Sequence, residues 1–190
     1  MSSHGDGGRV RIGHGSGGRL THALIRDLFQ RRLSNPILDR MDDAGLFRLS
    51  GKRLALTVDG FVVSPLFFNG GDIGSLAVNG TVNDLAVAGA VPRHLTLGAI
   101  LEEGLPLEQL ERAVDSVARA SREAGVSVVA GDTKVVERGK GDGIYFTTSG
   151  VGELRPGYPP TTAGAPADGA AIVVSGPLGD HGAVVLAARH

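Results

Sequence analysis

The 190-residue sequence contains no cysteine. This absence excludes a disulfide framework, a thiolate zinc site and a cysteine nucleophile. No apolar run approaches the roughly 20 residues of a membrane-spanning helix, and the N-terminal residues lack the apolar segment of a secretory signal. The net charge is −1, so no basic surplus favours nucleic acid or an anionic membrane as a partner. A globular, cytoplasmic protein is therefore the expectation.

Several catalytic motifs are also missing. The sequence has no GxxxxGK[ST] phosphate loop, no HExxH zinc helix, no GxSxG nucleophile turn and no protein-kinase motif set. Glycine, by contrast, is abundant: 30 residues, roughly twice the usual share of about 7%. The glycines cluster at residues 5–18, 69–74 and 139–152, which indicates tight turns and close backbone approaches.

Hydrophobic periodicity predicts an α/β fold. The expected helices and strands alternate, with helices at residues 20–33, 73–89 and 107–124 and strands at 53–58, 95–102, 126–130 and 143–154. After the first helix the order is β-α-β-α-β-β, which predicts a mixed sheet flanked by helices. The strand at 126–130 is expected to be buried, and the last two strands to be antiparallel because their connection is short.

Local signals set the expected ends of these elements. Ser16 can cap the first helix, and Asn35-Pro36 stops it, because the residue before proline disfavours the helical region. Residues 69–72, Asn-Gly-Gly-Asp, predict a turn and cap before the second helix. Gly89 and Gly125 are placed to end the second and third helices.

The composition also predicts domain boundaries. Residues 1–154 are expected to form one domain, with 1–12 as a flexible tail. Residues 155–168 hold four prolines and are typical of a linker. Residues 169–190 begin a strand and a helix that cannot bury their apolar faces alone. We expect them to be the truncated start of a second α/β domain.

Four aspartates stand at the ends of expected elements, each near glycine or another small residue: Asp43, Asp59, Asp84 and Asp132. Carboxylate oxygens are ligands that Mg²⁺ prefers, often together with substrate phosphates. Asp59-Gly60 could equally be a turn, and Asp42-Asp43 a solvated turn. Asp84 could share an exposed polar stripe with Asn83, although a carboxylate among small apolar residues favours pairing or metal binding.

Two further segments suit phosphate binding. The loop HGSGG comprises His14, Gly15, Ser16, Gly17 and Gly18, and it leads into a helix whose free N–H groups would attract an anion. The alternative is a glycine-rich terminus without a ligand. The run GDTKV places Asp132, Thr133 and Lys134 after a strand, where the lysine could steady negative charge or act as a base. The alternative there is a turn with an exposed lysine.

Five segments together resemble the hydrogenase maturation factor HypE family. They are HGSGGRLTHALIRDLF, SNPILDRMDDAG, LTVDGFVVSPLFFNGGDIGSLAVNGTVNDLAVAGA, LGAILEEGLPLEQLERAV and AGDTKVVERGKGDGIYFTTSGVGE. The likeness runs from about His14 to Glu153, and SGPLGDHGAVV is similar to the opening of the family's second domain. The family belongs to the superfamily of aminoimidazole ribonucleotide synthetase, selenophosphate synthetase and thiamine-monophosphate kinase.

The resemblance implies a PurM-like N-terminal domain that forms a homodimer and binds ATP near the subunit interface. It maps the superfamily's metal-binding acids onto Asp43, Asp59, Asp84 and Asp132, and nucleotide contacts onto His14–Gly18. By the same likeness, Asn83, Asp132 and Thr133 handle phosphate. Lys134 and Asp84 are the implied catalytic residues.

Members of this family dehydrate a thiocarbamate on a C-terminal cysteine to a thiocyanate, using ATP, for the cyanide ligand of nickel–iron hydrogenase. The implied partners are the carbamoyltransferase HypF and the HypC–HypD scaffold complex. This chain departs from the family because it lacks the acceptor cysteine, so we expect it to be inactive alone. Two alternatives stay open: a small-molecule phosphotransferase of the superfamily, or a non-catalytic nucleotide-binding or docking module.

Overall fold

The computed structural model describes residues 18–189, apart from 43, 158, 163–167 and 175. The chain divides into two compact units, Met1–Met41 and Asp42–His190. In the first unit, helix α1 (Arg19–Leu24) continues through a π-helical turn (η2, Ile25–Gln30) into α2 (Arg31–Leu33). The helix expected at 20–33 is thus confirmed, but the π-turn was not predicted.

The sequence predicts the C-terminal end of this helix correctly, but not its N-cap residue. Gly18, and not Ser16, occupies the N-cap position. At the other end the helix stops before Asn35-Pro36, as predicted, and the Asn35 carboxamide oxygen accepts a hydrogen bond from the N–H of Ile37. A short 3₁₀ turn, η3 (Leu38–Arg40), completes the unit.

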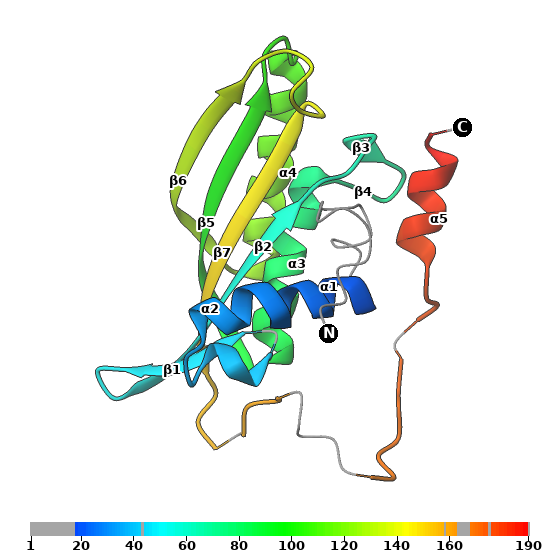
Figure 1. The fold of residues 1–190 in the computed structure, drawn as a ribbon. Helices are drawn as coiled ribbons and strands as arrows, with labels where there is room; N and C mark the ends of the chain where they lie inside the picture. Colours follow the sequence, from blue (N-terminus) through cyan, green and yellow to red (C-terminus); the bar gives the residue numbers. More distant parts are fainter. Residues whose placement is uncertain (1–17, 43, 158, 163–167, 175, 190) are drawn as a thin grey trace. The chain divides into compact units, whose positions relative to one another are not determined.

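The second unit is built on a mixed sheet of five strands, ordered β1-β2-β7-β5-β6. The strands are β1 (Gly45–Leu49), β2 (Lys52–Phe61), β5 (Ala90–Glu102), β6 (Ser127–Val136) and β7 (Ile144–Leu154). Within the described residues, β5 and β6 pair in parallel, and the other neighbouring strands of this sheet pair antiparallel. Figure 1 shows the strands side by side.

The predicted mixed sheet is confirmed, with three corrections. Strand β1 was not predicted, because its five residues carry little alternation. Strand β2 runs on to Phe61, so Asp59 lies inside a strand and not at its end. Strand β7 does run opposite to β6, as predicted, but it inserts between β2 and β5 and does not pair with β6.

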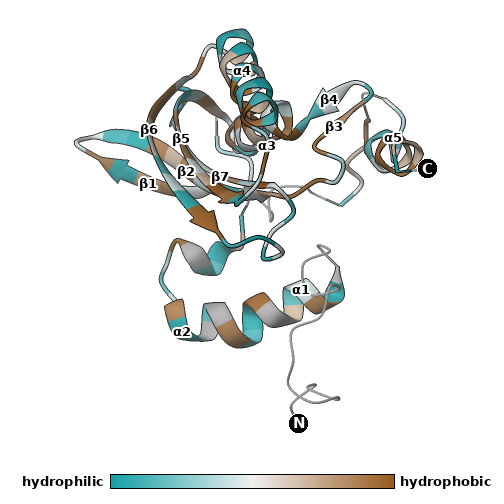
Figure 2. Ribbon diagram, turned by 90° about the horizontal axis from the view of Figure 1, so that it is seen from above, coloured by the Kyte–Doolittle hydropathy of each residue, from teal (hydrophilic) through white to brown (hydrophobic). Residues whose placement is uncertain are grey.

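Helices α3 (Ile73–Val87) and α4 (Leu107–Ala124) cover one face of the sheet (Figure 2). A capping box starts α3: the Asp72 carboxylate accepts from the N–H of Ser75, and the Ser75 hydroxyl accepts from the N–H of Asp72. The turn before it contains the short strands β3 (Phe67–Phe68) and β4 (Gly71–Asp72). Gly125 ends α4 at a φ of 68°, as the sequence predicts.

The core lies between these helices and the sheet. Alternate residues of β7 face it, among them Ile144, Phe146 and Thr148, and each is at most 1% exposed. Small residues on α3 permit close packing. A methyl group on Gly74 would lie 2.3 Å from the backbone oxygen of Ala113 on α4. The small side chains of α3 therefore allow it to lie close against α4.

The opposite face of the sheet carries exposed apolar side chains. Leu56, Val58 and Ile100 alternate with residues that face the helices, so they share this second face. We call it the open face. Strand β6 is exposed along nearly its whole length, which corrects the expectation of a buried strand. It is an edge strand, which its valine-rich sequence does not reveal.

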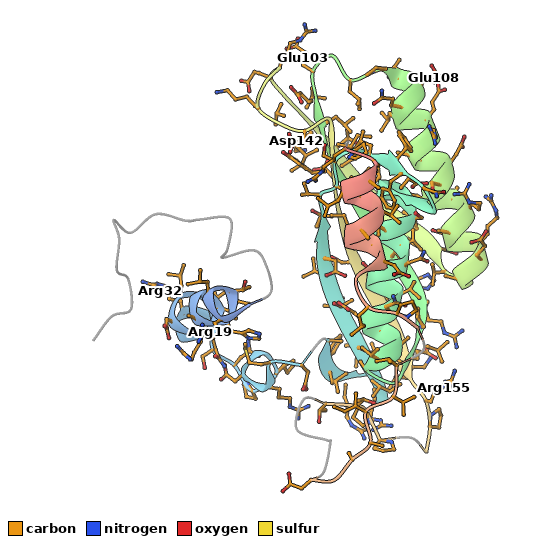
Figure 3. The ribbon with its side chains drawn as sticks, turned by 90° about the vertical axis from the view of Figure 1, so that its right-hand side faces the viewer. Arg19, Arg32, Glu103, Glu108, Asp142 and Arg155 are labelled. Atoms are coloured by element: carbon orange, nitrogen blue, oxygen red, sulfur yellow. The ribbon has the colours of Figure 1, made fainter. Side chains whose placement is uncertain are left out.

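The two ends of β7 mark the length of the sheet. Asp142, just before this strand, lies near Glu103 at one end, and Arg155, just after it, lies at the other (Figure 3). Past Arg155, the described residues up to Gly179 form no helix or strand. The strand expected near 171–174 is not formed; Ile172 and Val173 are almost fully exposed, because a strand needs a partner to pair with.

Helix α5 (Asp180–Ala187) is the expected helix of this C-terminal segment. Its Val185 is buried in the core, and His181 contacts the Phe68 ring edge to face at 5.6 Å between centroids. Within the described residues, no helix is long and apolar enough to cross a bilayer.

Candidate functional site

Two of the predicted acids lie on neighbouring elements, Asp59 on β2 and Asp84 on α3. Two hydrogen bonds cross between these elements. Thr57 Oγ1 on the strand donates to Asp84 Oδ2 on the helix at 3.0 Å. Thr81 Oγ1 on the helix lies 3.5 Å from Asp59 Oδ2 on the strand. The strand's threonine thus holds the helix's acid, and the helix's threonine holds the strand's acid.

The periods of strand and helix explain this crossed arrangement. Residues two apart in a strand share a face, which puts Thr57 and Asp59 toward the helix. Residues three apart in a helix share a face, which puts Thr81 and Asp84 toward the strand. The patterns T-x-D and T-x-x-D stand in the sequence at these positions, but only the aspartates were predicted as site residues.

Glycines allow α3 to approach the sheet at this point. A methyl group on Gly80 would lie 2.7 Å from two ring atoms of Phe61 and 3.7 Å from Asp59 Oδ2. A methyl group on Gly150 of β7 would lie 2.7 Å from the Thr81 methyl carbon. Larger side chains at either glycine would push the helix away from the sheet and separate the threonines from the acids.

Asp132 and Lys134 form a second group, on the exposed edge strand β6. Lys134 Nζ lies 2.7 Å from Asp132 Oδ2, and both side chains are 70% exposed. The pKa of the Asp132 carboxyl lies below its ordinary value. Three interactions cause this: the hydrogen bond from Lys134, the hydrogen bond from the N–H of Thr133, and attraction to the lysine charge. This carboxylate stays ionised and can accept further donors or a cation.

In one copy of the chain these two groups do not meet. The cross-strand row that contains Asp132 runs through Gly98, Thr147 and Gly60. Three strand spacings therefore separate Asp132 from Gly60, about 14 Å. Because Asp59 precedes Gly60, its side chain points to the other face of the sheet.

The structure describes only some of the other residues predicted to bind the nucleotide or the metal. His14, Gly15, Ser16, Gly17 and Asp43 lie outside the described residues. Gly18 caps α1 in the first unit, and Asn83 is exposed on α3 beside Asp84.

Among the residues that the structure describes, no three acidic or histidine side chains are grouped so that they could hold a metal ion. The Asp59–Asp84 pair supplies two carboxylates, which suits Mg²⁺ when substrate phosphates supply further oxygens.

A groove of about 730 Å³ opens between α4 and the β5–β6 side of the sheet. Its lining is mostly apolar, and Gly131, Asp132 and Thr133 lie along it. The Asp59–Asp84 pair is not part of this groove. The groove is therefore a feature of the β6 edge, separate from the pair of acids.

The family of the chain follows from its sequence and agrees with this fold. Residues 41–154 match the family "AIR synthase related protein, N-terminal domain". The chain belongs to this family. Its mixed sheet with α3 and α4 on one face is thus the N-terminal domain fold that the sequence predicted.

Among curated proteins, the chain is similar to hydrogenase maturation proteins. It is 55% identical over 183 residues to the hydrogenase expression/formation protein HupE of Azotobacter chroococcum mcd 1, and 53% identical over 182 residues to the carbamoyl dehydratase HypE of Azotobacter vinelandii. Each match covers 96% of this chain and 53% of the relative. The chain thus spans about half the length of these relatives.

Solved structures give the same result. A HypE structure in complex with ATP is 49% identical, with a TM-score of 0.70 over 95% of this chain and 53% of that one. A HypE–HypF complex is 52% identical, with a TM-score of 0.66 over 71% of this chain and 43% of that one. The predicted resemblance to HypE is confirmed.

Proposed function

We propose that this chain is the ATP- and Mg²⁺-binding N-terminal part of a HypE-type carbamoyl dehydratase. The observation that carries the proposal is the pair of carboxylates, Asp59 and Asp84, held by crossed threonine hydrogen bonds. The 45–55% identity to proteins of the HypE type and the likeness to a HypE–ATP complex support it. Because the 190 residues contain no cysteine, the thiol that carries the carbamoyl group has to be supplied by other residues.

The proposed reaction removes water from a thiocarbamate. The carboxamide oxygen attacks the γ-phosphorus of ATP, and ADP leaves. The nitrogen then loses its protons as the C–O bond breaks, and inorganic phosphate departs to leave a thiocyanate. Bound Mg²⁺ would neutralise the charge on the phosphates, a mainly electrostatic contribution. Asp59 and Asp84 would hold it, together with Asp43 and Asp132 as the resemblance implies.

For the nucleotide, we propose contacts with His14–Gly18, Asn83, Asp132 and Thr133. Lys134 is the proposed group that steadies the transferred phosphoryl. Its ion pair with Asp132 places the ammonium on β6 beside a carboxylate, which suits an electrostatic role. We propose that Asp84 acts in catalysis through the metal.

We also propose a homodimer formed through the open face. Leu56, Val58 and Ile100 are exposed there, and Asp132 and Lys134 lie on the same face. A second copy on this face would bury the apolar side chains and place the β6 group at a subunit interface. HypF and the HypC–HypD complex are the proposed partners, in the cytoplasm; the HypE–HypF complex of a relative supports the first of them.

Calorimetric titration with Mg²⁺–ATP tests the proposal. We expect Asp84→Asn to weaken binding at least about 10-fold, because the helix then offers the cation a neutral amide in place of a carboxylate. Asp115→Asn, an exposed acid on α4, is the matched control and should bind like the unaltered chain. Equal affinity in Asp84→Asn and in the unaltered chain would exclude the metal role of this residue.

A further inference from the structure

Three buried threonines lie under the pair of acids. Thr57 is 7% exposed, Thr81 0% and Thr148 1%. Buried hydroxyls need hydrogen-bond partners, and valine would fill the same space without that need. The hydroxyls of Thr57 and Thr81 meet carboxylate oxygens of Asp84 and Asp59. A packing role alone does not require hydroxyls at these positions.

Thr81 and Thr148 also hydrogen-bond to each other, and Thr148 Oγ1 lies 3.4 Å from the backbone oxygen of Ala77. Each hydroxyl has one proton to donate. The chain of hydrogen bonds can therefore be oriented in either of two directions. In one, Thr148 donates to Thr81 and Thr81 donates to Asp59. In the other, Thr81 donates to Thr148 and Thr148 donates to the Ala77 carbonyl.

We propose that Thr57 and Thr81 are positioning residues for the cation-binding carboxylates, and that Thr81 and Thr148 form a reversible hydroxyl relay. In the direction that serves the site, Thr148 donates to Thr81 and Thr81 donates to Asp59 Oδ2, which fixes the carboxylate. A carboxylate has about four lone-pair sites, so Thr81 keeps this hydrogen bond when a cation binds the same group. In the reverse direction, toward the Ala77 carbonyl, Asp59 loses this support while neither hydroxyl is left without a partner.

The surrounding packing keeps the relay in place. Gly150 leaves room for Thr81 against β7, since an added methyl would lie 2.7 Å from its Cγ2 and 3.0 Å from Leu85 Cδ1. Thr81 and Thr148 come from α3 and β7, which sit on either side of the core. The positions of both hydroxyls are therefore set by the packing of helix on sheet. This assignment rests on the proposed cation site.

The test measures Mn²⁺ affinity of the 190-residue chain with a non-hydrolysable ATP analogue, by electron paramagnetic resonance. We expect Thr57→Val and Thr81→Val each to weaken Mn²⁺ binding about 10-fold, the size typical for groups that orient metal ligands. Thr57→Ser and Thr81→Ser keep the hydroxyl and should stay within about 3-fold of the unaltered chain. Thr96→Val on β5 removes a hydroxyl away from the acids and should change nothing.

Two further measurements separate positioning from folding. The melting temperature of each variant shows whether a variant that binds weakly is unfolded. If a valine variant is unfolded, the corresponding serine variant still tests the role of the hydroxyl. In an Asp59→Asn background, Thr81→Val should weaken binding no further, because its effect acts through that carboxylate.

The outcomes distinguish the two proposals. If the unaltered chain binds Mn²⁺ and the valine variants bind it equally well, the positioning role is wrong and the cation site stands. If the folded, unaltered chain binds no Mn²⁺, the cation site and the positioning role are both wrong. Full additivity of Thr81→Val with Asp59→Asn would also overturn the assignment.

Discussion

Asp72 Oδ2 accepts a hydrogen bond of 2.7 Å from Ser116 Oγ, which joins the start of α3 to the middle of α4. The other oxygen of the same carboxylate caps α3 through the N–H of Ser75. Arg119 adds an ion pair at 3.8 Å, and the Asp72 side chain is only 13% exposed. One side chain therefore fixes a helix end and a helix–helix contact together.

Replacing this carboxylate should destabilise the protein. Asp72→Ala removes the cap and leaves the Ser116 hydroxyl without its acceptor, so we expect a loss of about 2 to 3 kcal/mol in the free energy of unfolding. Urea denaturation followed by circular dichroism measures it. Asp115→Ala, an exposed acid on α4, should change stability by less than about 0.5 kcal/mol. Similar losses in both variants would contradict the role of Asp72.

Gly74 lies where α3 and α4 approach each other closely. An added methyl group would lie 2.3 Å from the backbone oxygen of Ala113 and 3.0 Å from Ser116 Cβ. Because backbone cannot move aside as a side chain can, Gly74→Ala should cost about 2 to 3 kcal/mol by thermal or urea unfolding. At Gly60 nothing lies within 4 Å of an added methyl, so Gly60→Ala serves as the control and should be nearly neutral. An unchanged stability for Gly74→Ala would mean that the helices can separate freely.

Local chemistry made most of the fold predictable. The Asp72 cap, the Gly125 end of α4 and the Asn35-Pro36 stop are encoded within a few residues. The insertion of β7 between β2 and β5 depends on pairing across almost a hundred residues, and the sequence carries no local sign of it. The exposure of β6 also follows from its place at the sheet edge and not from its composition.

The candidate site, too, was only partly predictable from the sequence. The sequence predicts Asp59 and Asp84 as site residues. Their positions on neighbouring elements depend on the packing of α3 against β2, which the small residues of α3 favour. Asp-Gly wrongly indicated a strand end at Asp59, because the ladder to β7 continues past it. The separation of Asp132 from this pair depends on strand order, which spacing along the chain cannot give.

The ion pair on β6 gives a prediction about pH. Lys134 lowers the pKa of Asp132, so Lys134→Met should raise that pKa toward its ordinary value, measured by NMR titration of the carboxyl carbon. Part of the lowering should remain, since the N–H of Thr133 still donates. Lys140→Met is the control and should leave the Asp132 pKa unchanged.

The sign of the stability effect follows from the lowered pKa. The ionised Asp132 side chain stabilises the folded protein, and this stabilisation is fully present at pH values above the pKa of an aspartate in the unfolded chain, about 3.9. The stabilisation is lost as the pH falls from that value through the lower pKa that Asp132 has in the folded protein. Because the pair is exposed to solvent, the change in unfolding stability should be small and should shrink further with added salt. An Asp132 pKa identical in the protein with and without Lys134 would show that the ion pair does not form in solution.

The proposed dimer through the open face can be tested at Ile100. Ile100 is 40% exposed near the C-terminal end of β5, among the apolar side chains proposed to meet a second copy. A carboxylate in such an interface would be desolvated without a partner, so Ile100→Glu should weaken dimerisation at least about 30-fold. Sedimentation velocity over a range of protein concentrations measures this change. Leu107→Glu adds the same charge at a site 74% exposed at the start of α4, and its dimer should match that of the unaltered chain. If the unaltered chain sediments as a monomer at all concentrations, or if both variants dissociate alike, the open face is not the dimer interface.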